Sequence, residues 1–322
     1  MTRDMISRID ETVERINSHP EYSRKLRYKG YNTLLCEASR HSVSMELDLS
    51  NSKGTKNKLR ADLRNLKAAW DYLCGKGISL SSIARLGNLV EPEINKVPQF
   101  RNTAVQFGPF SPPVGYENIA RLVLDLVAFL NKEQLHPVSR SIEAHIELVR
   151  IHPYIDGNGR AARLLQSYFL EEHSYPPALI LPSERELYIG LLERTLNGRY
   201  NLETSFERPS DNEVLFRKFL ESKILGSALR LEEDLKTHRF YQITLKNLDG
   251  FGVVRCVANI LRTYGRSNGC GIKVKVFNPL KSKRIQYLLE VEGDLSRASL
   301  LGLIKRSSVK YDFNYEITTV RD

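Results

Sequence analysis

Residues 152–163 read His-Pro-Tyr-Ile-Asp-Gly-Asn-Gly-Arg-Ala-Ala-Arg, and no other stretch of the chain gathers so many chemically active groups. Two glycines and an asparagine break regular structure, and the polar side chains are too dense for a buried segment. Apolar residues with helical spacing precede the stretch up to Ile151, and a second helix is expected from Arg160 to about Glu172. The stretch is therefore predicted to be a polar loop that joins two helices.

This loop holds the groups that bind a phosphate ester. Pro153 disfavours the α conformation at His152, so this histidine is expected at a helix end, facing outward. An ordinary histidine pKa of ~6.5 would suit a general base. Asp156 offers a hard oxygen ligand of the kind that Mg²⁺ accepts beside substrate phosphates. The backbone N–H groups of residues 157–159 and the N-terminus of the next helix can bind an anion.

Two arginines complete the pattern. Arg160 and Arg163 are three residues apart on the expected helix, so they share a face. Guanidinium groups make bidentate contacts to phosphate oxygens, and two of them on one face suit a ligand with more than one phosphate. The competing interpretation is a solvated charge cluster, which does not explain why a base, a metal ligand and an anion loop coincide.

These residues resemble the signature of the Fic family, His-x-Phe-x-(Asp/Glu)-Gly-Asn-Gly-Arg-x-x-Arg, with Tyr154 in place of phenylalanine. The extra hydroxyl needs a polar partner or water, because the ring is expected to anchor the loop in the core. The resemblance implies the mainly α-helical Fido fold with a β-hairpin flap. It also implies transfer of AMP from ATP, with Mg²⁺, to a Ser, Thr or Tyr hydroxyl of a target protein.

The resemblance implies a role for each residue of the signature. His152 would deprotonate the target hydroxyl, and Asp156 would hold Mg²⁺. The remaining residues would bind ATP, with the loop on its phosphates and the arginines on its outer phosphates: Gly157, Asn158, Gly159, Arg160 and Arg163. Such a site works through positioning and charge neutralisation.

Residues 42–46, Ser-Val-Ser-Met-Glu, resemble the inhibitory motif of the same family, Ser/Thr-x-x-x-Glu-(Gly/Asn), except that Leu47 stands at the last position. In the family this glutamate lies on a helix and pairs with the second arginine of the signature. The resemblance implies that Ser42 and Glu46 inhibit the enzyme, because a carboxylate on Arg163 competes with the γ-phosphate there. The alternative is a surface glutamate on a helix.

Two further segments resemble parts of the family. Alternating side chains predict a short strand formed by Thr103, Ala104, Val105, Gln106 and Phe107. At this place the family has a flap hairpin that binds the target by strand addition. Tyr188 and Leu191 lie three residues apart on an expected helix and resemble the family's contacts to adenine. An ordinary surface hairpin and plain core packing are the respective alternatives.

From about residue 236 the pattern changes to β-α-β-β-α-β, which predicts a ferredoxin-like α+β domain. Residues 236–322 hold 16 Lys+Arg and 7 Asp+Glu, and so carry +9 of the chain's net charge of +10. With aromatic residues on the expected strands (Tyr241, Phe277 and Tyr287), this could indicate stacking of single-stranded nucleic acid. Target recognition, small-ligand binding and dimerisation through sheet edges are the alternatives.

The 322 residues suggest two or three domains. We expect N-terminal helices with the inhibitory motif over residues 1–95, the Fic core with its flap over 96–235, and the α+β domain over 236–322. Four cysteines without zinc spacing, no apolar run long enough for a membrane span and no signal peptide predict a cytoplasmic protein with free thiols and no membrane partner.

The favoured function is a protein adenylyltransferase that is inhibited by Glu46, because a module that only binds nucleotide has no use for a base at His152. The alternatives are removal of AMP from a modified protein, transfer from another nucleotide donor, and a non-catalytic nucleotide-binding regulatory module. ATP and a target protein are the expected partners. A homodimer stays open, and nucleic acid is a less favoured partner.

Overall fold

The computed structural model describes residues 4–19, 22, 24–47, 52–106, 115–131, 135–200, 206–237, 239–246, 248, 251–268, 272–277, 286–293 and 295–319. It divides into two compact units. The first unit comprises Met1–Val13 and Tyr31–Ala228, and the second comprises Glu14–Gly30 and Leu229–Asp322. The predicted boundaries near residues 95 and 235 stay predictions.

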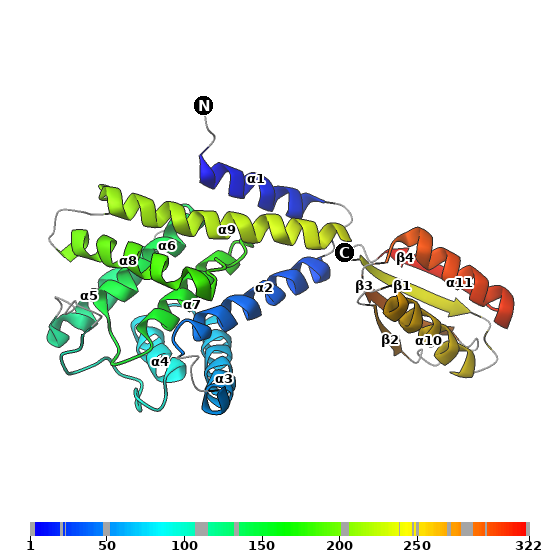
Figure 1. Cartoon of the computed structure of the whole chain (residues 1–322), viewed down its shortest axis with the longest axis horizontal. Coiled ribbons are helices and arrows are strands. Elements are labelled where there is room, and N and C mark those ends of the chain that lie inside the picture. Colours follow the sequence, from blue (N-terminus) through cyan, green and yellow to red (C-terminus); the bar gives the residue numbers. More distant parts are fainter. Residues whose placement is uncertain are drawn as a thin grey trace. The chain divides into compact units, whose positions relative to one another are not determined.

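The first unit is helical (Figure 1). Its helices are α1 (Met5–Ser18), α2 (Arg24–Ser44), α3 (Ser52–Lys76), α4 (Leu80–Val90), α5 (Ile119–Leu130), α6 (Pro137–Ile151), α7 (Asn158–Glu171), α8 (Arg185–Tyr200) and α9 (Asp211–Thr237). Parts of α1, α2 and α9 belong to the second unit. Two short 3-10 turns, Tyr116–Asn118 and Pro182–Glu184, precede α5 and α8. The predicted helical core is therefore confirmed.

Two central helices flank the signature loop. α6 and α7 pack against each other, and most of their residues are buried on every side, as is typical of helices in the middle of a core. Pro137 begins α6, where its fixed φ and missing N–H suit the first helical position. Because both helices are packed into the core, the loop between them has a fixed position in the first unit.

The predicted flap strand is not found in its described part. Residues 101–106 do not form a strand, and Phe107 lies outside the described residues. Side chains from Asn102 to Ala104 are exposed, and Val105 is half-buried. Alternation of residue types alone does not form a strand here, because a strand also needs a partner for its backbone hydrogen bonds.

The second unit contains β1 (Arg239–Lys246), α10 (Phe251–Ser267), β2 (Lys273–Phe277), β3 (Gln286–Gly293), α11 (Arg297–Tyr311) and β4 (Asn314–Thr319). The sheet order is β2-β3-β1-β4, and every neighbouring pair is antiparallel. In the central register, Ile243 lies opposite both Leu289 and Ile317. This arrangement confirms the ferredoxin-like β-α-β-β-α-β prediction.

The aromatic residues of this sheet do not form the stacking platform that the sequence suggested. Tyr241 is 2% exposed, and Tyr287 packs on Phe251 of α10 with ring centroids 5.8 Å apart, so both face the helices. Only Phe277, 42% exposed, is accessible among the three. The prediction was wrong because side chains alternate between the two faces of a strand, and the pattern did not show which face the helices cover.

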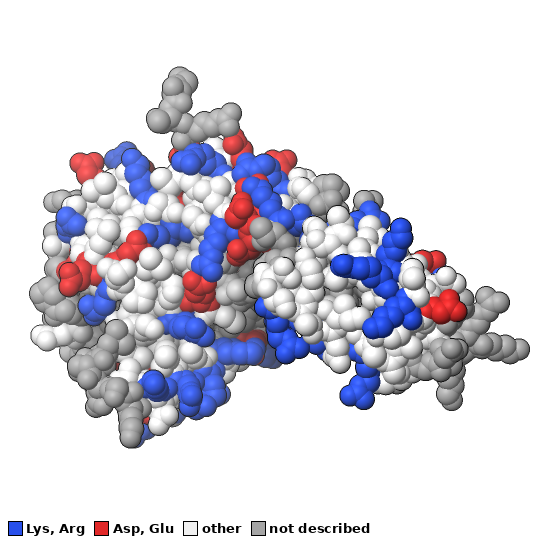
Figure 2. Space-filling view, turned by 45° about the vertical axis from the view of Figure 1, so that its right-hand side comes forward, with Lys and Arg blue, Asp and Glu red and all other residues white. Residues whose placement is uncertain are grey.

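Among the charged side chains of this unit, basic ones outnumber acidic ones. Figure 2 shows more Lys and Arg than Asp and Glu on its visible face.

No described helix is both long enough and apolar enough to cross a membrane. Three cysteines, Cys36, Cys74 and Cys256, are exposed free thiols, and Cys270 lies outside the described residues.

Candidate active site

Tyr154 and Asn158 anchor the signature loop in the core. The Tyr154 ring lies against Gly87 of α4, where an added Cβ would be 2.2 Å from the ring, and its hydroxyl donates to the carbonyl of Ile83 at 2.6 Å. The Asn158 carboxamide accepts from the N–H of Tyr154 at 3.0 Å and donates to its carbonyl at 2.9 Å. The expected polar partner of the tyrosine hydroxyl is therefore present.

Asn95 is a second anchor, which sequence reasoning missed. It is 6% exposed, and its amide nitrogen donates to the carbonyls of Gly87 at 3.0 Å and Asp156 at 2.8 Å. Its amide oxygen accepts from the N–H of Ile155 at 3.2 Å. A single asparagine in an irregular segment carries no sequence signal, because its partners in the signature loop lie about sixty positions away.

His152 caps the C-terminus of α6 in the left-handed conformation, with φ 49° and ψ 60°. His152 is thus outside the right-handed α region, as predicted, but the predicted outward orientation is wrong, because His152 is only 6% exposed. Arg101 holds this corner: its Nε donates to the carbonyl of His152 at 2.7 Å, and its N–H donates to that of Pro153 at 2.9 Å. The chain after α4 therefore lies against the base.

The surroundings of His152 define its protonation. Nδ1 lies 3.2 Å from the carbonyl of Val149, and a carbonyl can only accept, so Nδ1 carries the proton. Burial lowers the pKa of His152 to about 4, although the hydrogen bond to Val149 and the charge of Asp156 act in the opposite direction. At neutral pH the imidazole is therefore neutral, with a basic Nε2.

The N-terminus of α7 forms the floor of the site. Gly157 is its N-cap at φ 85°, where a Cβ would also lie 3.1 Å from Val90. The N–H groups of Asn158 and Gly159 have no carbonyl one turn earlier in the helix, so they favour an anion there. Asp156, 53% exposed, accepts from the N–H of Gly157 at 2.6 Å.

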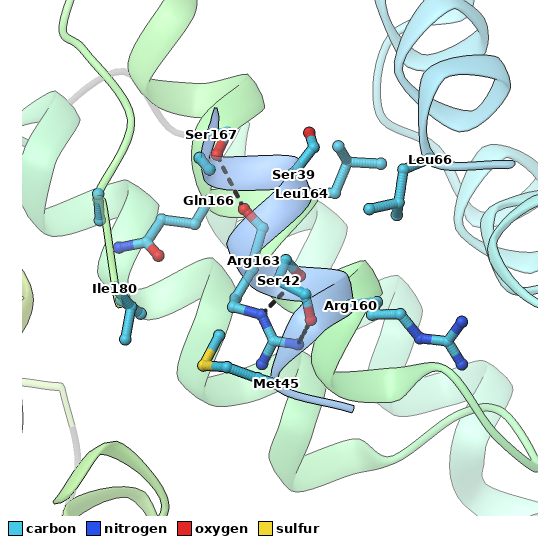
Figure 3. Close-up of a pocket in the computed structure, with 12 residues that line it drawn as sticks. Ser39, Ser42, Met45, Leu66, Arg160, Arg163, Leu164, Gln166, Ser167 and Ile180 are labelled. Carbon is cyan, nitrogen blue, oxygen red and sulfur yellow. Dashed lines mark hydrogen bonds between the residues drawn. The ribbon is translucent and has the colours of Figure 1, made fainter. Parts of the chain in front are cut away.

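Arg163 joins this floor to the end of α2 (Figure 3). Its Nε donates to Ser42 Oγ at 2.8 Å, and Nη2 donates to the Ser42 carbonyl at 3.2 Å and to Glu46 Oε1 at 2.7 Å. A Cβ on Gly159 would lie 3.2 Å from both Glu46 Oε1 and Arg163 Nη1. The carboxylate of Glu46 therefore lies against the N-terminus of α7.

Glu46 differs from the family pattern in one respect, since it lies in the turn that follows α2 and not on the helix. Arg185 Nε donates to the carbonyl of Met45 at 2.7 Å and so fixes this turn. Burial alone would raise the pKa of Glu46, but the charge and hydrogen bond of Arg163, with Arg160 and Arg185, lower it. Glu46 is therefore an anion at neutral pH.

Arg160 has different partners from Arg163. Its Nη2 donates to Glu91 Oε2 at 2.7 Å and lies 3.5 Å from Asp156, and its Nη1 lies 3.7 Å from Asp62. The two guanidinium groups point apart in Figure 3, although both residues line the pocket drawn there. The binding of one ligand's phosphates by both arginines stays a prediction.

Residues 79–170 match the family model described as Fic/DOC family. This segment contains α4, the signature loop and nearly all of α7. The segment 79–170 belongs to the Fic/DOC family. Ser42 and Glu46 precede the matched Fic segment.

Curated relatives of the Fic domain carry the name Protein adenylyltransferase Fic. The protein from Drosophila grimshawi is 38% identical over 126 residues, which are 38% of this chain and 26% of the relative. The protein from Drosophila mojavensis is 36% identical over 126 residues, or 38% of this chain and 25% of the relative. The chain thus spans about a quarter of the length of these relatives.

Solved structures share the fold. A Fic-domain-containing signaling protein from Bacteroides thetaiotaomicron has a TM-score of 0.59 at 19% identity, covering 72% of this chain and 98% of that one. A Fic family protein from Desulfovibrio desulfuricans has a TM-score of 0.57 at 16% identity, covering 97% of this chain and 88% of that one. At these identities the likeness concerns the fold alone.

The expected adenine contacts are both buried in the first unit, which is called the Fic unit below because it contains the matched segment. Tyr188 is 1% exposed and Leu191 is 7% exposed, and both lie on α8. The Tyr188 hydroxyl accepts from Arg163 Nη1 at 3.3 Å and lies 2.8 Å from Nε2 of the buried His145. The contacts thus connect Tyr188 to the arginine of the signature, and its adenine role stays a prediction.

Proposed function

We propose that this chain is a protein adenylyltransferase, which moves AMP from ATP to a Ser, Thr or Tyr hydroxyl of a target protein, and that Glu46 inhibits it. The observation that carries the proposal is the 2.7 Å ion pair between Glu46 and Arg163 against the N-terminus of α7. This is where an outer phosphate of ATP would lie. The curated relatives support the reaction, since their names state it.

His152 would act as the general base. Its unprotonated Nε2 would take the proton of the target hydroxyl while the hydroxyl oxygen attacks the α-phosphorus of ATP. The bond from that phosphorus to the bridging oxygen breaks, and pyrophosphate leaves. A pKa of about 4 keeps the base unprotonated at neutral pH.

The phosphates would lie over the floor of the site. The N–H groups of Asn158 and Gly159 are positioned for them at the positive end of α7. Asp156 would hold Mg²⁺, since one exposed carboxylate beside bound phosphates is a sufficient protein ligand for that ion. Among the described residues no group of three or more His, Cys, Asp or Glu side chains is arranged to hold a metal ion by itself. When bound, the ion would neutralise charge on the phosphates.

Glu46 would inhibit by occupying the place of an outer phosphate. Its anionic carboxylate and a phosphate would compete for the same N–H of Arg163 and for the same helix terminus. The Glu46 side chain is 39% exposed, so it can leave towards solvent without disrupting the core. Release of this one side chain would therefore make the site available to ATP.

The target protein would bind beside the base. Arg101 contacts both the carbonyl of His152 and, through Nη1 at 2.8 Å, the carbonyl of Thr103, so the exposed chain from Thr103 begins next to the site. This segment, continuing to Phe107, would pair with an extended stretch of the target. The exposed free thiols of Cys36 and Cys74 favour a reducing compartment such as the cytoplasm.

Transfer of label from α-labelled ATP with Mg²⁺ tests both parts of the proposal. We expect Glu46→Gly to label protein at least about tenfold faster than the unmodified chain, because a hydrogen bond between charged groups is worth roughly 1.5–3 kcal/mol. Glu37→Ala is the matched control, since this carboxylate lies on α2, nine positions before Glu46, and its partner at 3.9 Å is His41 and not Arg163. It should leave the rate unchanged.

The possible outcomes separate the alternatives. Equal labelling of Glu46→Gly and the unmodified chain would refute inhibition by Glu46. Binding of ATP without labelling in any variant would point to another nucleotide donor, to AMP removal or to a regulatory module. Loss of AMP from a labelled protein only while Glu46 is present would favour AMP removal.

A further inference from the structure

The hydroxyl of Tyr188 connects Arg163 to a buried chain of hydrogen bonds. Arg163 Nη1 donates to it at 3.3 Å, it lies 2.8 Å from His145 Nε2, and His145 Nδ1 lies 3.0 Å from Gln166 Oε1. Tyr188, His145 and Gln166 are at most 2% exposed. The four side chains come from α6, α7 and α8, so this relay joins three helices of the core.

The chemistry of the partners fixes the direction of each hydrogen bond. Gln166 Oε1 can only accept, so His145 Nδ1 carries the proton. Burial lowers the pKa of His145 to about 3, so the ring is neutral and its Nε2 accepts. Tyr188 therefore donates to His145, and its oxygen lone pairs remain for the N–H of Arg163.

Arg163 is held by neutral groups and faces one exchangeable anion. Ser42, 4% exposed, accepts from Nε and Nη2, and Tyr188, 1% exposed, accepts from Nη1. The Glu46 side chain on Nη2 is 39% exposed. The neutral partners are thus fixed in the core, whereas the anionic partner can be replaced from solvent.

We propose that Tyr188 is a positioning residue for Arg163. Through its hydroxyl, the relay fixes the guanidinium so that Nη2 faces the anion at the N-terminus of α7, first Glu46 and then an outer phosphate of ATP. The identity of this second anion rests on the proposed function. An ordered guanidinium binds more tightly than a mobile one, because less side-chain freedom is lost on binding.

The proposal differs from an adenine contact in the part of Tyr188 that matters. An adenine contact would use the ring, but the ring lies beneath the guanidinium of Arg163 at 5.6 Å and beside Phe216 at 6.0 Å. A positioning role needs the hydroxyl, which reaches both Arg163 and His145. Tyr188→Phe removes the hydroxyl and keeps the ring, so it separates the two roles.

The test is calorimetric titration of two probes, ATP with Mg²⁺ and inorganic tripolyphosphate, which has no base. Both are titrated into Glu46→Gly with and without Tyr188→Phe. We expect the Kd of each probe to rise about tenfold, as for loss of one hydrogen bond to a charged group. The matched control is Tyr168→Phe, which removes a hydroxyl bonded to Glu172 at 2.9 Å on the same helix as Arg163. It should change neither Kd.

A second variant covers the case in which Tyr188→Phe does not fold. His145→Leu keeps Tyr188 but removes the acceptor of its hydroxyl, and should also raise both Kd values. Unchanged Kd values in folded Tyr188→Phe would overturn the relay. A rise for ATP alone would also overturn it and would favour a contact to adenine. Failure of Glu46→Gly to bind ATP while it binds tripolyphosphate would refute the proposed function alone. Failure to bind either probe would refute both proposals.

Discussion

The Fic unit and the C-terminal α+β unit use charge in opposite ways. In the Fic unit the key charges are buried and paired: Arg160, Arg163 and Arg199 are each at most 8% exposed, and each contacts a carboxylate within 2.7 Å. In the second unit, α10 and α11 contain no acidic residue. Their basic residues are all exposed and form no ion pair with a described residue: Arg255, Arg262, Arg266, Arg297, Lys305, Arg306 and Lys310.

This difference shows that an excess of charge does not indicate where the candidate active site lies. Residues 236–322 carry +9 of the net charge of +10, yet the candidate base, metal ligand and anion site all lie in the other unit. Buried and paired charges have fixed geometry, which a reaction at a phosphate requires. Exposed and unpaired charges create a long-range field that attracts acidic partners but fixes no geometry.

The largest expected effect concerns the base of the Fic unit. In the Glu46→Gly background, we expect His152→Ala to lower the rate of label transfer by about 10²–10⁴-fold, the usual contribution of general base catalysis. The Kd for ATP should stay within about twofold, because in the proposed mechanism His152 would contact the hydroxyl and not the phosphates. Transfer rates and calorimetry on one preparation measure both.

His173→Ala is the control for this variant, since His173 lies at the far end of α7 beside Arg140. The pH profile gives a further check. The base must be unprotonated, and its pKa is lowered to about 4, so transfer should persist from pH 8 to pH 5 and fall only below that range. Loss of rate around pH 6.5, or loss of ATP binding in His152→Ala, would contradict the assigned role.

A second effect concerns stability. Arg199 bridges Glu143 of α6 at 2.6 Å, Glu147 of the same helix at 2.5 Å and Glu213 of α9 at 2.6 Å, and the network is buried. We expect Arg199→Met to lower the free energy of unfolding by about 3–5 kcal/mol, because it leaves carboxylates without their buried partner. Denaturant unfolding of the full chain measures this change.

The smallest expected effect comes from the second unit. We expect the double variant Arg306→Glu/Lys310→Glu to change the free energy of unfolding by less than about 0.5 kcal/mol, because both residues are exposed and have no acidic partner among the described residues. ATP binding by Glu46→Gly should be unaffected. A loss comparable to that of Arg199→Met would show that these charges have a structural role.

Much of this molecule follows from local sequence. Pro153 disfavours the right-handed α conformation at His152, Gly157 suits the positive φ at the start of α7, and the hydrophobic pattern predicts the order of helices and strands, including all six elements of the α+β domain. The local pattern failed where a partner was needed. The strand expected from Thr103 is not found over its described residues, 103–106, and Tyr241 and Tyr287 face the helices instead of an open sheet surface.

By itself, the sequence determined the residue types of the site, because the backbone preferences of Pro and Gly and the chemistry of His, Asp and Arg depend on nearby positions only. The tertiary structure decided which of these groups meet. Glu46 reaches Arg163 across 117 positions, Asn95 anchors a loop some sixty positions away, and Tyr188 bridges Arg163 and His145. The burial that lowers the pKa of His152 to about 4 likewise exists only once α6, α7 and the chain around Arg101 have packed together.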